Sequence, residues 1–124
     1  MTKPLAVVFY ESLLLGSQLE NRLSDLGWRV QTVNSSASVT EAVRRHSPMV
    51  LVAELALRHG DFCAIITELK KDPALEHVPV IGYTSAKNKA LQDAAVAAGA
   101  RLVAVDTAIL EQLPQLLDYA LALD

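Results

Sequence analysis

The hydrophobic residues of this chain fall into two alternating patterns. Short apolar runs, of the length expected for strands buried on both faces, occupy residues 5–9, 28–33, 49–53, 78–83 and 101–105. The segments between and after them place apolar residues at helical spacing, which predicts amphipathic helices over 12–26, 38–46, 61–70, 87–98 and about 110–123. The sequence therefore predicts strands and helices in strict alternation.

This alternation predicts the class of fold. Neighbouring parallel strands need crossover connections, and helical crossovers cover both faces of the sheet. We therefore predict an α/β fold: a doubly wound (βα)5 flavodoxin-like sandwich whose five-stranded parallel sheet has the strand order 2-1-3-4-5. The length of 124 residues fits one domain, so residues 1–124 are expected to fold as a single unit.

Residues at the borders of the helices carry signals for where each helix begins or ends. Gly27 follows the first helix as a stop. Ser38 and Glu41 have the spacing of a capping box, and Asp61 is expected to cap the next helix. Pro114 fits the last helix only if it lies in the first turn, because proline has no backbone N–H.

Composition and charge exclude several classes of function. The chain is 52% hydrophobic and 20% charged, as in ordered globular proteins. Its net charge is −3 and its lysines and arginines do not cluster beyond pairs, so no nucleic-acid partner is expected. Without an apolar run long enough for a bilayer or a signal peptide, and with the single cysteine Cys63, the sequence favours a cytoplasmic protein with no membrane partner.

The sequence offers no arrangement typical of an enzyme. No Ser-His-Asp or Cys-His constellation can be argued from it, and the first apolar run is followed by Tyr10 and Glu11 instead of a glycine-rich phosphate loop. The three histidines lie on different elements without ligand spacing. We therefore expect no enzymatic activity and no cofactor.

The second half of the chain carries a distinctive pattern. Residues 69–81 read LKKDPALEHVPVI, Thr84 follows, and Ala98-Gly99-Ala100 comes later. This stretch resembles the second half of the receiver domains of bacterial response regulators, and the length and order of elements extend the resemblance over essentially the whole chain. In receivers, phosphorylation needs an aspartate after the third strand, two acids after the first, a hydroxyl after the fourth and a lysine after the fifth.

The resemblance places the phosphorylation acceptor on Glu54, because residues 48–54 read PMVLVAE where receivers have Pro-Asp, four apolar residues and the acceptor aspartate. The extra methylene moves the carboxylate by about 1.5 Å, and an error of ~1 Å in a reacting site can cost ~100-fold in rate. The acidic pair falls on Tyr10 and Glu11, or on Phe9 and Tyr10 if the alignment shifts by one residue. At most one metal-binding carboxylate remains there.

Three further receiver positions can be assigned through the resemblance. Thr84 keeps the hydroxyl, whereas Asp106 stands at the lysine position and Val103 at the aromatic switch position. An anion thus replaces the cation that binds the phosphoryl oxygens of receivers. The resemblance therefore implies a degenerate receiver that has lost ordinary phosphorylation.

The sequence leaves several functions open. The first is a stand-alone signalling domain that acts as a phosphorylation-independent protein-interaction module. The second is a working phosphorelay receiver that uses Glu54 or a neighbouring acid, and the third is a small-molecule or metal sensor at the strand ends. For the third, Glu11, Glu54 and Asp106 are expected to gather there, with Glu11 and Glu54 as weak metal ligands. Glu54 could also imitate a phosphorylated aspartate, although Asp106 would repel rather than attract it.

The last two helices carry more apolar surface than one face of a sheet needs. In receivers, these helices and the strand between them form the common dimer and partner surface. We therefore expect a signalling protein or a second copy of the chain to bind a candidate interface made of Val96, Ala97, Leu116, Ala120 and Leu123.

Overall fold

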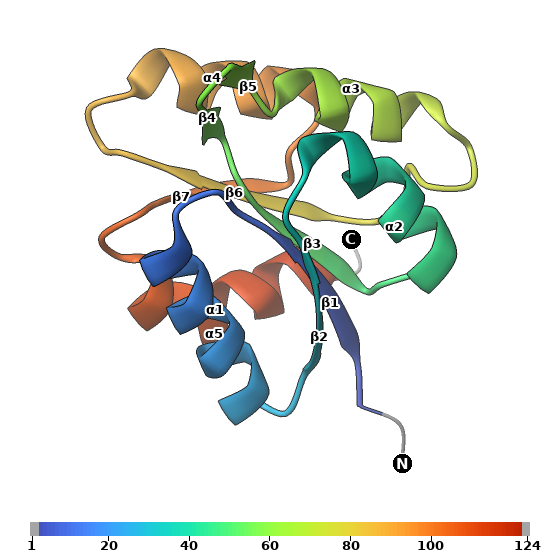
Figure 1. Cartoon of the computed structure of the whole chain (residues 1–124), viewed down its shortest axis with the longest axis vertical. Coiled ribbons are helices and arrows are strands. Elements are labelled where there is room, and N and C mark those ends of the chain that lie inside the picture. The colour runs from blue at the N-terminus through green and yellow to red at the C-terminus, as the bar shows by residue number, and fades with distance from the viewer. Residues whose placement is uncertain (1–2, 123–124) are drawn as a thin grey trace.

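The computed structural model describes residues 3–122 of the chain, which alternate between strands and helices (Figure 1). The strands are β1 (Leu5–Phe9), β2 (Arg29–Val33), β3 (Val50–Glu54), β4 (Ala56–Leu57), β5 (Gly60–Asp61), β6 (Val80–Thr84) and β7 (Leu102–Val105). The helices are α1 (Leu13–Asp25), the 3-10 turn η1 (Ser36–Ser38), α2 (Val39–His46), α3 (Cys63–Lys71), α4 (Lys89–Ala98) and α5 (Ile109–Leu121).

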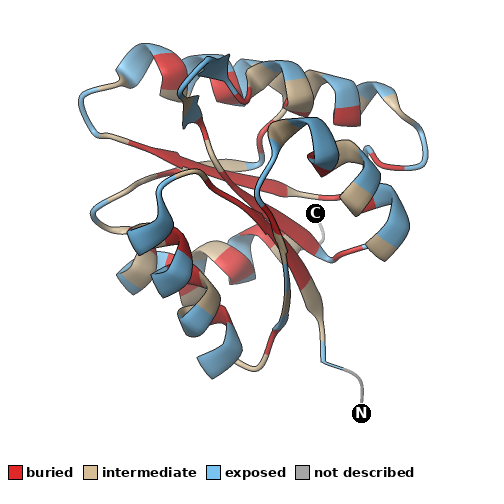
Figure 2. Cartoon of the chain, in the orientation of Figure 1, coloured by how far each residue is buried: buried red, intermediate tan, exposed pale blue. Residues whose placement is uncertain are grey.

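The main sheet has five parallel strands in the order β2-β1-β3-β6-β7. This confirms the predicted α/β class and the order 2-1-3-4-5, with β6 and β7 as the fourth and fifth long strands. Helices α1 and α5 cover one face of the sheet, and α2, α3 and α4 cover the other (Figure 1). The central strands β1, β3 and β6 are buried along most of their length (Figure 2).

Each helix buries a narrow apolar stripe against its face of the sheet. In α1 the buried positions are Gly16, Leu19 and Leu23, and in α5 they include Leu113 and Leu117, at the helical spacing seen in the sequence. α1 and α5 have 13 residues each, and within residues 3–122 no helix is both long and apolar enough to cross a membrane. Packing of these stripes holds the helices on the sheet.

A small hairpin follows β3, where the sequence indicated only a connection. Strands β4 and β5 pair antiparallel, and the amide of Phe62 then donates to the carbonyl of Leu55 at 2.9 Å. The Phe62 ring is fully buried and stacks on Phe9 with centroids 5.3 Å apart. Gly60 has a φ of 110°, a conformation that favours glycine. The segment after Glu54 is therefore an ordered part of the fold.

Two predictions about helix ends need correction. Ser38 is the N-cap of α2, but its side chain makes no capping hydrogen bond, because its backbone is already helical at φ −97° and ψ −3°. Pro114 lies inside α5, beyond the first turn that begins at Ile109. Packing of Leu113 and Leu117 offsets the hydrogen bond that proline cannot donate. Asp61 does bind the start of α3, since its Oδ1 accepts from the amide of Cys63 at 2.9 Å, but it lies one residue before Phe62, which is the N-cap.

Candidate functional site

The predicted site residues follow the carboxyl ends of the strands, which meet at one end of the parallel sheet. β1 ends at Phe9, so Tyr10 and Glu11 are the two residues after it. Glu54 is the last residue of β3 and Thr84 the last of β6, and Asp106 directly follows β7. The fold thus places all four predicted segments at the same end of the sheet.

The carboxylate of Glu54 is bound to the loop between β1 and α1. Its Oε1 accepts hydrogen bonds from the amide nitrogens of Glu11 at 2.7 Å and Ser12 at 2.9 Å. Its Oε2 accepts from the hydroxyl of Ser12 at 2.8 Å. Hydrogen bonds to an ionised acceptor are among the stronger ones in proteins. We call these three hydrogen bonds the Glu54 clasp, because they join the end of β3 to the start of α1.

The carboxylate of Glu11 binds the hairpin that follows β3. Its Oε1 accepts a hydrogen bond from the amide of Arg58, in the turn of the β4–β5 hairpin, at 2.8 Å. It does not line the pocket that contains Glu54 and Asp106. All three acids lie at the strand ends as expected, but only Glu54 and Asp106 line this pocket, because the unpredicted hairpin offers the Glu11 carboxylate a backbone donor.

Tyr10 belongs to the core rather than to a metal site. It is 7% exposed and packs with the residues between the sheet and the helices α1 and α5. Its hydroxyl donates to Oε1 of Glu20 at 3.1 Å, and burial followed by the bond to Glu20 raises the pKa of the phenol. The first position of the receiver acidic pair therefore supplies no carboxylate.

Receiver chemistry implies a magnesium ion at this end of the sheet, and the residues present do not fit one. Mg²⁺ takes oxygen ligands, chiefly carboxylates and water, in octahedral geometry. Here the carboxylate of Glu54 is held by the clasp and that of Glu11 by Arg58. Across residues 3–122, no group of three or more histidine, cysteine, aspartate or glutamate side chains is arranged to hold a metal ion.

A pocket of about 360 Å³ lies beside the clasp. It is lined by Ser12, Leu14, Leu15, Gln18, Glu54, Ala56, Tyr83, Thr84, Ser85 and Asp106. The Tyr83 side chain is 1% exposed, and its hydroxyl makes no hydrogen bond with any described residue. Burial is the largest cause that raises the pKa of this phenol. The charge of Glu54, the neighbouring Tyr10 and the charge of Asp106 raise it further. Nothing in the sequence indicates this unpaired hydroxyl.

The switch position of receivers has no moving aromatic side chain here. Val103 is half-buried and pairs with Gly82 across β6 and β7. A Cβ atom on Gly82 would lie 2.6 Å from Cδ2 of Leu55, so the leucine fills the space above the glycine. Thr84 keeps its hydroxyl at the end of β6, but the residue is buried and only 5% exposed.

The predicted interface residues have different surroundings. Val96 is 57% exposed and Ala97 is also exposed, whereas Leu116 is half-buried beside a groove on α5. Ala120 is buried at 5% exposure in the core under α5, so its assignment to the interface is wrong, and Leu123 lies outside the described residues. Tyr119, which the sequence analysis did not select, is 61% exposed and lines the same groove.

Solved structures of receiver-type proteins have the same fold as this chain. A proposed response regulator from Chloroflexus aurantiacus J-10-fl superposes with a TM-score of 0.91 at 16% identity, over 98% of this chain and 100% of that chain. The receiver domain of NtrX from Brucella abortus gives 0.84 at 20% identity, over 94% and 97% of the two chains. The chemotaxis protein CheY4 from Vibrio cholerae gives 0.85 at 13% identity, over 96% and 99%.

These similarities establish the fold. No protein-family model matches the sequence, and no curated protein is similar to it at the level of sequence. In a longer NtrX chain, the match spans 27% of that protein at 20% identity. The resemblance to receiver domains is thus confirmed for the architecture, and the chain has the receiver-domain fold.

Proposed function

We propose that this chain is an atypical receiver-like domain that acts in signal transduction through protein contacts, without phosphorylation, catalysis or a cofactor. The Glu54 clasp is the observation that carries this proposal. The carboxylate at the acceptor position takes three hydrogen bonds from Glu11 and Ser12. An oxygen engaged in this way is a poor nucleophile toward phosphorus.

The surrounding charges also disfavour phosphoryl transfer. The chemistry depends on cations that neutralise the phosphoryl oxygens. The pocket beside the clasp instead contains the carboxylates of Glu54 and Asp106, and its described lining residues include no Lys or Arg. A phosphoryl group there would meet two negative charges, and the neutral donors that line the pocket, such as Thr84 and Ser85, could not neutralise it.

The clasp also suggests how the domain could work without a switch. Glu54 ties the β1–α1 loop to β3, and Glu11 ties the same loop to the turn of the β4–β5 hairpin. These bonds hold three connecting segments in one arrangement. A partner would then meet a constant surface, and signalling would depend on the amount or location of the domain, which we place in the cytoplasm.

The partner surface in this proposal is the face formed by α4, β7 and α5. It carries the exposed Val96, Ala97 and Tyr119, beside a groove lined by Leu102, Gln112, Gln115, Leu116 and Tyr119. Among residues 3–122, the residues that line the groove carry no charge. Two copies related by a two-fold axis would therefore meet there without bringing like charges together, and we name a second copy of the chain as the partner.

Phosphorylation can be tested directly. The purified chain would be incubated with acetyl phosphate and Mg²⁺, with intact mass as one readout and amide NMR shifts with beryllofluoride as the other. We expect no phosphoryl adduct and no shifts at Glu11, Glu54 or Thr84, while an ordinary receiver domain reacts in parallel. An adduct that disappears in the Glu54→Gln variant would establish the competing function, a phosphorelay receiver that uses Glu54.

Self-association requires a separate measurement. Sedimentation equilibrium over a range of concentrations should show a dimer that Val96→Glu and Tyr119→Glu both weaken. Leu13→Glu is the matched control, because Leu13 is also an exposed apolar residue, at 72%, but lies on α1. A monomer at all concentrations, or equal loss of dimer in the control, would contradict the proposed surface.

A further inference from the structure

The hydroxyl of Tyr83 is the only buried side-chain nitrogen or oxygen atom that lacks a hydrogen bond among residues 3–122. Tyr83 is 1% exposed, and it lines the pocket beside the Glu54 clasp. Folded proteins pair the large majority of their buried polar side-chain atoms, so an unpaired one calls for a physical reason. Because Tyr83 belongs to the wall of a pocket, a bound molecule is one source of the missing partner.

Three adjacent strands direct Tyr83 and the two acids of the pocket to the same face of the sheet. Tyr83 is the register partner of Glu54 across β3 and β6, and of Ala104 across β6 and β7. Register partners on neighbouring parallel strands point to the same face, and side chains alternate along a strand, so Asp106 follows Ala104 on that face. Ala104 and Tyr83 belong to the core under α1 and α5, which identifies the face. The phenol, Glu54 and Asp106 thus converge on one pocket, and after burial the charges of both acids raise the pKa of the phenol.

The pocket has negative charge without a cation to balance it. Its described lining residues include Glu54 and Asp106 but no lysine, arginine or histidine, which gives a formal charge of −2. Asp106 makes no salt bridge with any residue in the described range 3–122. The three donors to Glu54 are two amides and a hydroxyl, all neutral, and Oε2 accepts one of them. A carboxylate oxygen has two lone pairs, so Oε2 can accept a second hydrogen bond.

The rest of the pocket is partly apolar and has an adjustable rim. Leu14, Leu15 and Ala56 line it beside the polar groups, and Leu14 is 78% exposed. A ligand stem laid on Leu14 would remove apolar surface from water, which favours binding. The oxygen of Tyr83 is itself covered. Exposed side chains change rotamer rapidly, so Leu14 and the exposed Gln18 can move to admit a ligand to this oxygen.

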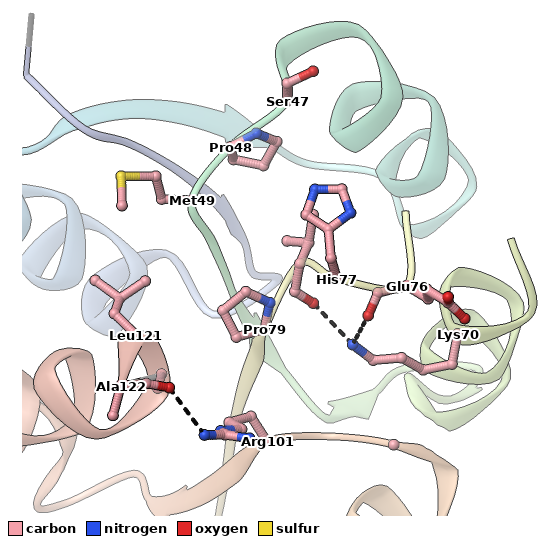
Figure 3. Close-up of a pocket in the computed structure, with 13 residues that line it drawn as sticks. Ser47, Pro48, Met49, Lys70, Glu76, His77, Pro79, Arg101, Leu121 and Ala122 are labelled. Carbon is pink, nitrogen blue, oxygen red and sulfur yellow. Dashed lines mark hydrogen bonds between the residues drawn. The ribbon is translucent and has the colours of Figure 1, made fainter. Parts of the chain in front are cut away.

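A larger pocket, of about 730 Å³, lies at the opposite end of the sheet and has no unpaired group of this kind. There, Nζ of Lys70 donates to the carbonyl oxygens of Glu76 and Val78, each at 2.9 Å (Figure 3). Nη2 of Arg101 donates to the carbonyl of Ala122 at 3.4 Å. The lining residues of that pocket all lie within residues 3–122, and none has a buried side-chain nitrogen or oxygen atom without a hydrogen bond. The smaller, acidic pocket therefore has the stronger claim to a ligand.

We infer that the pocket beside the clasp binds an organic ammonium ion, with its charge between Glu54 and Asp106 and one N–H directed at the hydroxyl of Tyr83. Its apolar stem lies against Leu14 and Leu15. An ammonium group has three N–H donors and no acceptor, so it can donate to both carboxylates and to the phenol oxygen together. It needs no octahedral set of ligands, unlike Mg²⁺, and it leaves the clasp intact. The inference rests on one part of the proposed function, that Glu54 stays unphosphorylated, and not on the partner surface.

The test is an amide NMR titration of the purified chain at neutral pH and constant ionic strength, with benzylamine, benzyl alcohol and methylamine as probes. Benzyl alcohol lacks the charge, and methylamine lacks the apolar body. We expect benzylamine to shift the amides of Ser12, Ser85 and Asp106 and to bind at least about tenfold more tightly than either comparison compound. Equal affinity for either of them, the absence of a saturable shift, or shifts scattered over the exposed acids would overturn the inference.

A pair of charge variants separates a built site from attraction to overall charge. Asp106→Asn should weaken the binding of benzylamine at least about tenfold, because it removes one of the two charged acceptors. Asp118→Asn removes the same charge from an exposed position on α5 that does not line the pocket, and it should change the affinity by less than about twofold. Equal effects of the two variants would contradict the inference.

The Tyr83→Phe variant tests the hydroxyl itself. It should weaken the binding of benzylamine about threefold or more, because one hydrogen bond from a charged donor is lost, while the chain without the amine becomes more stable. A merely structural role would not combine a gain in stability with a loss of affinity, and an unchanged affinity would overturn the inference. The phosphorylation test uses no amine, so failure of amine binding without a phosphoryl adduct contradicts this inference alone, whereas an adduct on Glu54 contradicts the proposed function.

Discussion

Ser12 is bound twice by the carboxylate of Glu54, once through its amide nitrogen at 2.9 Å and once through its hydroxyl at 2.8 Å. The two residues are 42 positions apart in the chain. They join the end of a central strand to the residue before the first helix. The glutamate side chain thus makes a structural contact between these two elements.

The clasp predicts a measurable contribution to stability. Ser12→Ala removes one of the three hydrogen bonds to Glu54 and should lower the free energy of unfolding by about 1 kcal/mol. Glu54→Gln should cost somewhat more, because an amide replaces one charged acceptor oxygen with a donor. Urea denaturation of both variants and of the double variant gives the coupling between the two residues.

Ser35→Ala is the matched control for this measurement. Ser35 is exposed, and its side chain makes no capping hydrogen bond at η1. Its replacement should change stability by less than about 0.5 kcal/mol. If Ser12→Ala behaves like this control, the hydroxyl of Ser12 does not stabilise the fold and the clasp does not fix the site.

The hydroxyl of Tyr83 predicts a substitution that stabilises the protein. This group is buried and makes no hydrogen bond with a described residue, so the folded state bears its desolvation without compensation. Tyr83→Phe should raise the free energy of unfolding by about 1 kcal/mol. Tyr10→Phe is the matched control and should lower it, because the Tyr10 hydroxyl donates to Glu20. A loss of stability in Tyr83→Phe would mean that its hydroxyl does have a partner in solution.

The long elements could be predicted from the sequence because their burial is complete. β1 and β3 are central strands covered on both faces, and such strands read as unbroken apolar runs. The hairpin of β4 and β5 could not, since strands of two residues show no periodicity and the turn residues Arg58 and His59 carry no hairpin signal. The sequence did not predict the burial of Ala120, because helical spacing identifies the centre of the apolar stripe of a helix but not how wide that stripe is.

The candidate site was predictable in position but not in contacts. The resemblance to receivers placed Glu54 and Asp106 at the ends of their strands, where the structure has them. The bonds of Glu54 reach across 43 and 42 residues to backbone donors, and Glu11 reaches 47 residues to the amide of Arg58. Backbone donors carry no sequence signature, so nothing in the pattern could show which amides would receive these carboxylates.

Gly16 predicts the effect of a single added methyl group. A Cβ atom at this position would collide with the ring of Tyr10, which is buried beneath the helix. Gly16→Ala should gain ~1 kcal/mol from helix propensity and lose more than that from overpacking, which typically costs ~1–3 kcal/mol. We therefore expect net destabilisation in urea. Ser24→Ala, in the same helix at an exposed position, should be neutral or slightly stabilising, and a stabilised Gly16→Ala would show that Tyr10 can move aside.

The thiol of Cys63 should titrate at unusually high pH. Burial, followed by the charge of Asp61 and a hydrogen bond to it, raises the pKa of the thiol from 9.0 to about 11. The rate of alkylation by iodoacetamide follows the thiolate, so it should keep rising about tenfold per pH unit beyond pH 9 and level off only near pH 11. In the protein unfolded by urea, the pH midpoint of the alkylation profile should return toward 9.0, the ordinary pKa of the thiol.

The Asp61→Asn variant separates the causes of this shift. It removes the charge of Asp61 but leaves the thiol buried. Because burial is the larger cause of the shift, the pH midpoint of alkylation should fall only part of the way from about 11 toward 9.0. The raised pKa also fixes the sign of a stability effect. The folded state favours the neutral thiol, so its contribution to stability is complete below about pH 9 and is lost as the pH rises toward about 11. An alkylation profile in the folded protein that levels off near pH 9 would contradict the burial of this thiol.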